Sequence, residues 1–229
     1  MQGETENKMK VLKKAILIVF LISVITHLPA REKPFEDEIK RFKEMDLQAM
    51  PPQNAILFVG SSTFRKWENM QSYFPGYNII NRGFGGSTFP DIIAYENDII
   101  FPYHPRQIVI YCGDNDLAYS QIVTPQLVFR RFAQLFSFIR RRLPNTSIAY
   151  ISIKPSPSRK KMWDKMNVAN NMIRAFMSRN ENTAFVDVFN KMLLSDGELR
   201  SDLFSEDQLH LNKKGYALLQ QTIQPYLIK

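Results

Sequence analysis

Two short stretches, far apart in the sequence, carry side chains that together could cleave an ester. Near the C-terminus, Asp207 precedes His210 by three positions, a spacing that lets both side chains lie on the same side of one helical turn. The carboxylate can then accept the Nδ1 proton of the imidazole and leave Nε2 free as a base. The other stretch, Gly-Ser-Ser at 60–62, follows the first strand-like apolar run, where such a base can activate a serine on a tight turn. The spacing predicts a serine hydrolase with Ser62, His210 and Asp207 as its catalytic residues.

Acyl transfer also needs hydrogen-bond donors for the negative charge that develops on the substrate oxygen. The turn that holds Ser62 is predicted to open a helix, which would aim the backbone N–H of Ser62 at this oxygen. The glycine-rich segment 83–86 lets the backbone approach closely, and one of its N–H groups can be a second donor. The side-chain amide of Asn115 is a suitable third donor.

Each motif has a simpler explanation when it stands alone. A Gly-Ser-Ser after a strand is commonly a helix cap, and segment 113–116 would ordinarily be a turn. The glycines at 83–86 could hold phosphate, although they match neither the GxGxxG nor the P-loop pattern. Asp207 and His210 could be a surface pair or part of a metal site, but a chain with only three histidines argues against a multi-histidine site. The four motifs in this order favour catalysis.

The elements that must position these motifs alternate along the chain from residue 54 onward. Short runs that are nearly continuous in Val, Ile, Leu and Phe predict strands buried on both faces. Between them lie helical patterns, one of which starts at Thr124, and a last helix that Asn212 can cap. This β-α-β alternation predicts a three-layer α/β/α sandwich around a five-stranded parallel sheet. The strand candidates are 55–59, 77–80, 107–112, 147–153 and 184–186.

The predicted sheet explains how distant motifs could meet. In parallel sheets, ligands collect where the loops leave the carboxyl ends of the strands. Segments 60–62, 81–88 and 113–116 follow the first three predicted strands, and Asp207 and His210 precede the final helix. Four loops are therefore expected to converge at one edge of the sheet.

Composition argues against several other classes of protein. A chain of 229 residues that is 45% hydrophobic is long enough for one domain with a buried core. The single cysteine, Cys112, rules out an internal disulfide framework and lies in an apolar run typical of the core. The net charge of +8 suggests nucleic-acid binding, but the arginines at 130–131 and 140–142 fall on the polar face of a predicted helix. No nucleic-acid-binding module accompanies them, so we expect no nucleic-acid partner.

The N-terminal thirty residues predict export. Lysines between positions 8 and 14 precede the apolar run 15–25, as in a secretory signal. The run is shorter than the ~20 residues that span a bilayer, yet residues 28–30 fit a cleavage site poorly. A cleaved signal and an uncleaved membrane anchor through residues 15–30 therefore both stay open. The expected location is periplasmic or extracellular.

The start of the signal is itself a hypothesis. Met9 begins a tidier signal sequence than Met1, so Met9 is the expected initiator, which N-terminal sequencing of the unprocessed product would test. Beyond the signal, the charged composition of the next residues predicts a polar, partly helical lead-in. The expected division is a signal peptide or anchor at 1–30, a lead-in at 31–54 and a catalytic domain at 55–229.

With these motifs in view, residues 55–229 resemble the SGNH hydrolases, also called the GDSL esterase/lipase family. Segment 60–63 resembles the first block of that family, which places the nucleophile at Ser62 rather than Ser61. Gly86 matches the glycine whose N–H serves the oxyanion hole. The first block departs from Gly-Asp-Ser-Leu at its second and fourth positions, which weakens any role taken from that Asp and leaves the nucleophile unaffected.

The other two blocks follow the family more closely. Segment 113–116 fits the G-x-N-D pattern, which gives Asn115 the remaining oxyanion role, and segment 207–210 matches D-x-x-H. The resemblance implies a flavodoxin-like sandwich, no metal or organic cofactor, and ester hydrolysis through an acyl-enzyme. It does not imply one substrate, because members act on lipids, thioesters, acetylated sugars and other esters.

The substrate is therefore the least determined part of the prediction. No long apolar lid segment is evident, which favours short acyl groups such as acetyl on a carbohydrate. The alternatives are a lysophospholipase or lipid esterase at a membrane surface, and a non-catalytic carbohydrate-binding protein on the same fold. The oligomeric state is not readable. Residues 154–157 are candidates for shaping the substrate pocket, as are Arg65, Trp67 and Trp163, which have core packing as their alternative.

Overall fold

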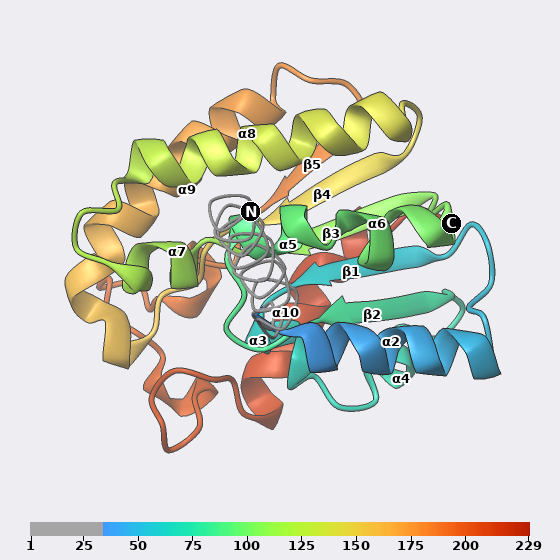
Figure 1. Ribbon diagram of the computed structural model, residues 1–229. Coiled ribbons are helices and arrows are strands. Elements are labelled where there is room, and N and C mark those ends of the chain that lie inside the picture. Colours follow the sequence, from blue (N-terminus) through green and yellow to red (C-terminus); the bar gives the residue numbers. More distant parts are fainter. Residues whose placement is uncertain (1–33) are drawn as a thin grey trace, which may run out of the picture. The chain divides into compact units, whose positions relative to one another are not determined.

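Five parallel strands lie at the centre of the computed structural model, which describes residues 34–229 (Figure 1). Their order across the sheet is β2-β1-β3-β4-β5, which confirms the predicted flavodoxin-like α/β/α sandwich. The predicted export segment, 1–30, lies outside the described residues. The strands are β1 (Ile56–Gly60), β2 (Ile79–Gly83), β3 (Gln107–Tyr111), β4 (Ser147–Ile151) and β5 (Thr183–Val186).

Helices cover both faces of this sheet (Figure 1). The α-helices are α2 (Glu36–Gln48), α3 (Ser62–Arg65), α4 (Met70–Tyr73), α5 (Phe89–Ala94), α6 (Glu96–Ile99), α7 (Asp114–Tyr119), α8 (Pro125–Arg142), α9 (Trp163–Met177) and α10 (Lys213–Ile223). Short 3₁₀ segments are η1 (Phe101–Tyr103), η2 (Pro157–Met162), η3 (Asn190–Met192), η4 (Ser201–Leu203) and η5 (Gln224–Tyr226). No helix among residues 34–229 is both long enough and apolar enough to cross a membrane.

Beyond the polar residues Gln107 and Ser147 that begin β3 and β4, the central strands are almost entirely apolar because both of their faces are buried. In β1, Ile56 and Phe58 pack into one hydrophobic core, whereas Leu57 and Val59 pack into the other. Successive side chains point to opposite faces of a strand, so a strand between two helical layers needs apolar residues at nearly every position. This is the reason that near-continuous apolar runs identified the strands.

The edge strand β2 differs from the prediction of 77–80. It begins at Ile79 and continues through the polar residues Asn81 and Arg82 to Gly83. The Asn81 side chain donates to the Phe64 carbonyl oxygen at 2.8 Å and accepts from the Gly83 N–H at 2.9 Å. Because polar side chains with their own partners interrupt the apolar run, hydrophobicity alone ends this strand too early.

The segment predicted as a polar, partly helical lead-in contains α2, which packs within the same compact unit as the sheet, Phe35–Lys229. Ile39 of α2 is buried in the core. Near the end of α2, Asp46 pairs with the buried Arg82, whose Nε donates to the Tyr103 hydroxyl at 2.6 Å. The Tyr103 hydroxyl in turn donates to Asp46 at 2.5 Å. A buried guanidinium thus requires the carboxylate of α2, since an unpaired buried charge is costly.

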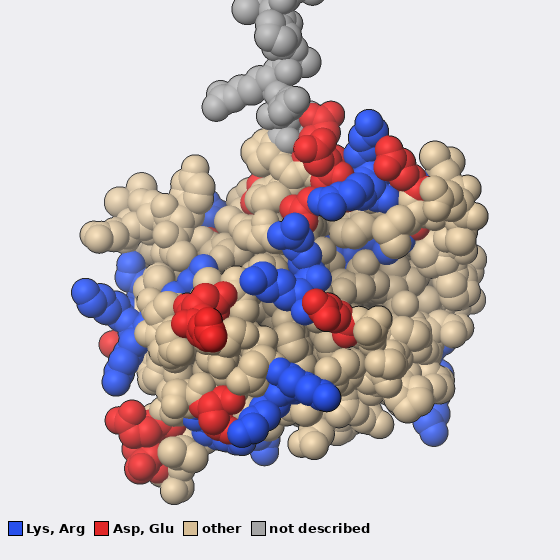
Figure 2. Space-filling model, turned by 90° about the horizontal axis from the view of Figure 1, so that it is seen from below, with Lys and Arg blue, Asp and Glu red and all other residues tan. Residues whose placement is uncertain are grey.

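Several basic side chains contact other residues of the fold rather than gathering in one surface patch. Arg131 pairs with the buried Asp116, Arg140 donates to the Thr146 carbonyl oxygen at 2.6 Å, and Arg142 lies over the Phe101 ring. On the face shown in Figure 2, described Lys and Arg side chains are interspersed with Asp and Glu. This distribution is typical of a solvated surface.

Candidate active site

The turn that carries Ser62, the predicted nucleophile, is called the nucleophile turn and begins where β1 ends against β3. A Cβ atom at Gly60 would lie 2.0 Å from the Tyr111 carbonyl oxygen, so only glycine fits at this crossing. Ser61 then occupies the N-cap position of α3 and is buried, while Ser62 is the first helical residue and is partly exposed. The structure therefore presents the Ser62 side chain toward solvent. The Ser62 N–H lies in the first turn of α3, where backbone amides lack intrahelical acceptors.

The segment that holds Asp207 and His210 is not the helical turn that their spacing suggested. It forms an irregular turn in which Gln208 has a left-handed backbone, with φ of 57°. Asp207 Oδ1 accepts the backbone N–H groups of Leu209 at 3.0 Å and His210 at 2.9 Å. Aspartate side chains favour such local turns over a helix because they compete for backbone donors. The carboxylate folds the chain back and so brings the imidazole to its other oxygen.

A continuous line of polar contacts joins Asp207, His210 and Ser62. His210 Nδ1 lies 2.5 Å from Asp207 Oδ2, and His210 Nε2 lies 3.0 Å from Ser62 Oγ, across 148 positions of sequence. Hydrogen bonds from the His210 side chain and backbone hold the pKa of Asp207 well below its usual range. The carboxylate is therefore ionised at neutral pH, where it favours the Nδ1–H tautomer and leaves Nε2 facing the hydroxyl.

Contacts between α10 and α3 keep the two halves of this line together. Asn212, directly after the turn, caps α10 by accepting the N–H groups of Lys214 at 2.9 Å and Gly215 at 3.1 Å, as the sequence predicted. Tyr216 of α10 donates its hydroxyl proton to the Thr63 carbonyl oxygen at 3.0 Å. The position of His210 relative to Ser62 is thus set by a helix that packs against the nucleophile turn.

The two loops expected to supply oxyanion donors are joined through Ser87. The Ser87 hydroxyl donates to the Gly60 carbonyl oxygen at 3.2 Å, and Asn115 Nδ2 donates to the Ser87 carbonyl oxygen at 3.1 Å. The neighbouring Gly86 is exposed, with φ of 79°, and has open space where a side chain would stand. These contacts gather the loops after β1, β2 and β3 at the carboxyl edge of the sheet.

The sequence predicted no catalytic role for Arg159 and Lys154, two charged residues that contact these segments. Arg159 Nη2 donates to Asn115 Oδ1 at 2.8 Å, and its Nη1 lies 2.9 Å from Asp114 Oδ2. Lys154 Nζ donates to the Leu209 carbonyl oxygen at 2.7 Å. Their position after the fourth strand was visible in the sequence, but nothing there signals that they meet Asn115 and the His210 turn.

The buried Lys154 makes the stability of the protein depend on pH. Burial lowers its pKa to about 8, while Asp114 and Asp207 oppose this shift and Arg159 adds to it. The ordinary value of 10.5 applies to the unfolded chain. Between these values the unfolded chain binds more protons, so raising the pH favours the folded state. We expect the free energy of unfolding to increase from pH 8 to 10.5 relative to that of Lys154→Met.

Denaturant titrations of both proteins at several pH values measure this difference. Lys161→Met is a matched control, because Lys161 is exposed in the same region of the chain and should keep the wild-type pH profile. Parallel profiles for the wild type and Lys154→Met would show that Lys154 titrates normally in the folded protein.

The aromatic candidates for the substrate pocket have structural roles. Trp67 is buried, with its ring centroid 5.1 Å from that of Tyr216 and 5.6 Å from that of Phe74. Trp163 contacts the ring of Phe189 edge-on. Core packing is thus the explanation that the structure supports for both tryptophans.

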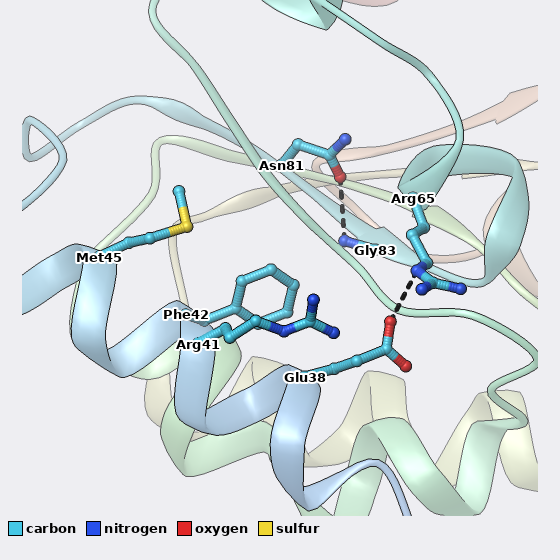
Figure 3. Close-up of a pocket in the computed structure, with 7 residues that line it drawn as sticks. All are labelled: Glu38, Arg41, Phe42, Met45, Arg65, Asn81 and Gly83. Carbon is cyan, nitrogen blue, oxygen red and sulfur yellow. Dashed lines mark hydrogen bonds and ion pairs between the residues drawn. The ribbon is translucent and has the colours of Figure 1, made fainter.

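Arg65 points away from the core toward α2. Figure 3 shows it reaching Glu38, with Nε 2.7 Å from Oε1, at a cavity of about 220 Å³. The residues that line this cavity include neither Ser62 nor His210. Arg65 therefore ties α3 to α2.

The single cysteine, Cys112, is a core residue, as the sequence predicted. It is fully buried, and burial raises the pKa of its thiol well above the usual value. A protonated, inaccessible thiol is a poor nucleophile. Among residues 34–229, no group of three His, Cys, Asp or Glu side chains is placed to hold a metal ion.

Solved structures with the same arrangement of elements include several esterases. A candidate platelet activating factor from Streptococcus pneumonia is 21% identical, with a TM-score of 0.74, and the match covers 93% of this chain and 99% of that one. A GDSL-like lipase from Bacteroides thetaiotaomicron is 20% identical, with a TM-score of 0.70, and 82% and 96% are covered. A mutant of an acetyl-xylooligosaccharide esterase from Geobacillus Stearmophilus is 16% identical, with a TM-score of 0.62, and 78% and 96% are covered. At these identities the likeness is one of fold.

Sequence comparison identifies the family. A search among curated proteins finds no significant match. The model of the GDSL-like lipase/acylhydrolase family, however, matches residues 57–218, which include the turn of Ser62, the two loops expected to supply oxyanion donors and the turn of Asp207 and His210. Since this match spans well over half of the chain, the protein belongs to the GDSL-like lipase/acylhydrolase family and is a hydrolase of ester bonds.

Proposed function

We propose that the protein is a serine esterase in which Ser62, His210 and Asp207 form the catalytic triad. The observation that carries this proposal is the unbroken line of contacts, 2.5 Å from Asp207 to His210 and 3.0 Å from His210 to Ser62. A base within hydrogen-bonding distance of a hydroxyl, itself oriented by a carboxylate, is the arrangement that activates a serine.

In the first half of the reaction, Ser62 Oγ attacks the carbonyl carbon of the ester and His210 Nε2 takes its proton. The charged Asp207 stabilises the imidazolium that forms. The negative charge on the former carbonyl oxygen is held by the N–H groups of Ser62 and Gly86 and by the Asn115 amide. His210 then gives its proton to the departing alcohol, which leaves an acyl group on Ser62.

The second half returns the enzyme to its starting state. Water enters where the alcohol left, and His210 Nε2 takes one of its protons as the oxygen attacks the acyl carbon. The same donors stabilise the second oxyanion. When this intermediate collapses, the proton on His210 passes to Ser62 Oγ and the carboxylic acid is released.

The proposed substrates are esters of short acyl groups, such as acetylated carbohydrates. The proposed site reaches the surface at its carboxylate, because the Asp207 side chain is 45% exposed. A polar, hydrated rim suits an alcohol part that carries hydroxyl groups, as a sugar does. Two structures of similar fold are named acetyl xylan esterase and acetyl-xylooligosaccharide esterase, which supports the same substrate class. The export signal expected at 1–30 would bring the enzyme to extracellular or periplasmic esters.

A series of p-nitrophenyl esters from acetate to palmitate tests the acyl preference. We expect kcat/KM to be highest for acetate and to fall steadily with chain length, by at least tenfold at eight carbons. Acetylated xylooligosaccharides, assayed by acetate release, should also be cleaved. A maximum at long chains, together with cleavage of lysophospholipid, would contradict the short-acyl proposal and support a lipid esterase.

A further inference from the structure

The segment between β4 and α9 contacts both halves of the proposed site. Residues 154–159, the bridge segment, run from the end of β4 into η2. Lys154 and Ser158 of this segment touch the turn of Asp207 and His210, and Arg159 touches Asn115. The bridge segment therefore contacts both the turn of the proposed base, His210, and the proposed oxyanion donor, Asn115.

The turn of Asp207 and His210, called the acid–base turn, is contacted through its backbone. Lys154 Nζ donates to the Leu209 carbonyl oxygen at 2.7 Å, and the Ser158 N–H donates to the Gln208 carbonyl oxygen at 3.0 Å. Gln208 and Leu209 are the two residues between Asp207 and His210. These bonds hold the strained part of the turn, where Gln208 has positive φ.

The contact to Asn115 determines which way its amide faces. A guanidinium can only donate, so Arg159 Nη2 at 2.8 Å must face Oδ1 of Asn115 and never its amino group. The Nδ2 amino group is thereby turned to the opposite side. One of its protons goes to the Ser87 carbonyl oxygen at 3.1 Å, which leaves the second for an oxyanion.

Arg159 is itself anchored rather than free to bind substrate. Its side chain is only 13% exposed, and Nη1 lies 2.9 Å from Oδ2 of Asp114, a residue that is also buried. The guanidinium is thus held to the segment that contains Asn115 by a hydrogen bond from Nη2 and an ion pair at Nη1. A short planar fork of this kind gives orientation as well as attraction.

We propose that Arg159 is a positioning residue of this esterase, which fixes the amide of Asn115 as an oxyanion donor while the bridge segment holds the acid–base turn. This inference rests on the proposed function, because it assigns Arg159 a role through Asn115. Arg159 acts on the transition state only, since the oxyanion charge develops after the substrate has bound.

The Arg159→Met variant tests the proposal with p-nitrophenyl acetate. Loss of the fork frees the amide to rotate, and misplacement of a catalytic group costs on the order of 10–10² in rate. We expect kcat to fall by about this factor while KM stays within twofold. Lys161→Met removes an exposed charge close by and should match the wild type.

A double-mutant cycle separates positioning from general damage. Asn115→Ala alone should lower kcat by about 10²–10³. If Arg159 acts through Asn115, adding Arg159→Met to Asn115→Ala should cost less than threefold more. The proposal would be overturned if the loss of kcat in the double variant equalled the product of the two single losses. It would also be overturned if Arg159→Met raised KM and left kcat unchanged.

Two further measurements keep the test decisive. Should Arg159→Met fail to fold, Arg159→Lys keeps a charge opposite Asp114 but lacks the fork, and the same loss of kcat is expected from it. Ser62-dependent labelling by a fluorophosphonate reports on the proposed function separately. Retained labelling with wild-type kcat in the Arg159 variants would reject the positioning role alone, whereas wild-type activity in Ser62→Ala would reject the triad.

Discussion

Replacing Ser62 by alanine is expected to lower kcat for p-nitrophenyl acetate by about 10⁶-fold, to the level left by binding and the oxyanion donors. The hydroxyl lies 3.0 Å from His210 Nε2, so the change removes the only atom at this position that could form the acyl-enzyme. Ser62 is partly exposed at the start of α3, and its loss should leave the fold intact. Steady-state kinetics of the purified variant, with circular dichroism as a check on folding, measure the effect.

The neighbouring serine supplies the matched control. Ser61 is fully buried at the N-cap position and its hydroxyl lacks a hydrogen-bond partner in the described structure, so Ser61→Ala should retain most of the activity. A fluorophosphonate probe should label the wild type and Ser61→Ala at Ser62 and leave Ser62→Ala unlabelled. Such labelling also distinguishes an esterase from a carbohydrate-binding protein of the same fold, which needs no reactive serine.

His210→Ala is expected to have an effect of the same size, about 10⁶-fold on kcat, because Ser62 without its base is a neutral and weak nucleophile. Asp207 would then keep its charge with no imidazole to orient. Measuring kcat with p-nitrophenyl acetate, where the leaving group needs little protonation, isolates the loss of the base in the attack step.

A second histidine tests the specificity of this effect. His104 ends η1 with a left-handed backbone, φ 41°, and asparagine tolerates that conformation, so His104→Asn should leave kcat unchanged. Retention of more than a hundredth of wild-type activity in His210→Ala would mean that another group serves as the base. Equal losses in both histidine variants would point to damage of the fold rather than to catalysis.

The sequence predicted the sheet well because its strands are buried on both faces. Burial favours apolar residues at nearly every position of β1, β3 and β4, and such runs are visible without any knowledge of the fold. The edge strand β2 was placed too early because Asn81 and Arg82 are polar and find their partners in α3, α2 and η1. Those partners are distant in sequence, so no local pattern reveals them.

For α2 too, the local sequence predicts the helix but not the partners that position it. Its composition is charged, with only Ile39 fully buried, so the local pattern indicates no more than a polar helix. Its place beside the sheet follows from the Asp46 carboxylate meeting the buried Arg82. A pair formed across 36 residues depends on the tertiary structure.

In the candidate site, residue types and spacing were sufficient to nominate Ser62, Gly86, Asn115, Asp207 and His210, because catalysis restricts which side chains can perform each step. The geometry that supports these roles was not contained in the spacing. Asp207 and His210 meet through a turn with a left-handed Gln208 rather than through a helix. Backbone conformation of this kind depends on bonds from Lys154 and Ser158, which the tertiary structure brings to the turn.

The sequence by itself determined the fold class, the family and the candidate residues for cleaving an ester. Only the tertiary structure decided which serine is exposed and how the His210 imidazole reaches it. It also decided that Arg159 donates a hydrogen bond to the side-chain amide of Asn115. The physical reason is that apolar burial and chemical competence are properties of residues and their near neighbours. Hydrogen bonds of about 3 Å between loops depend instead on how strands and helices pack, and therefore on the whole chain at once.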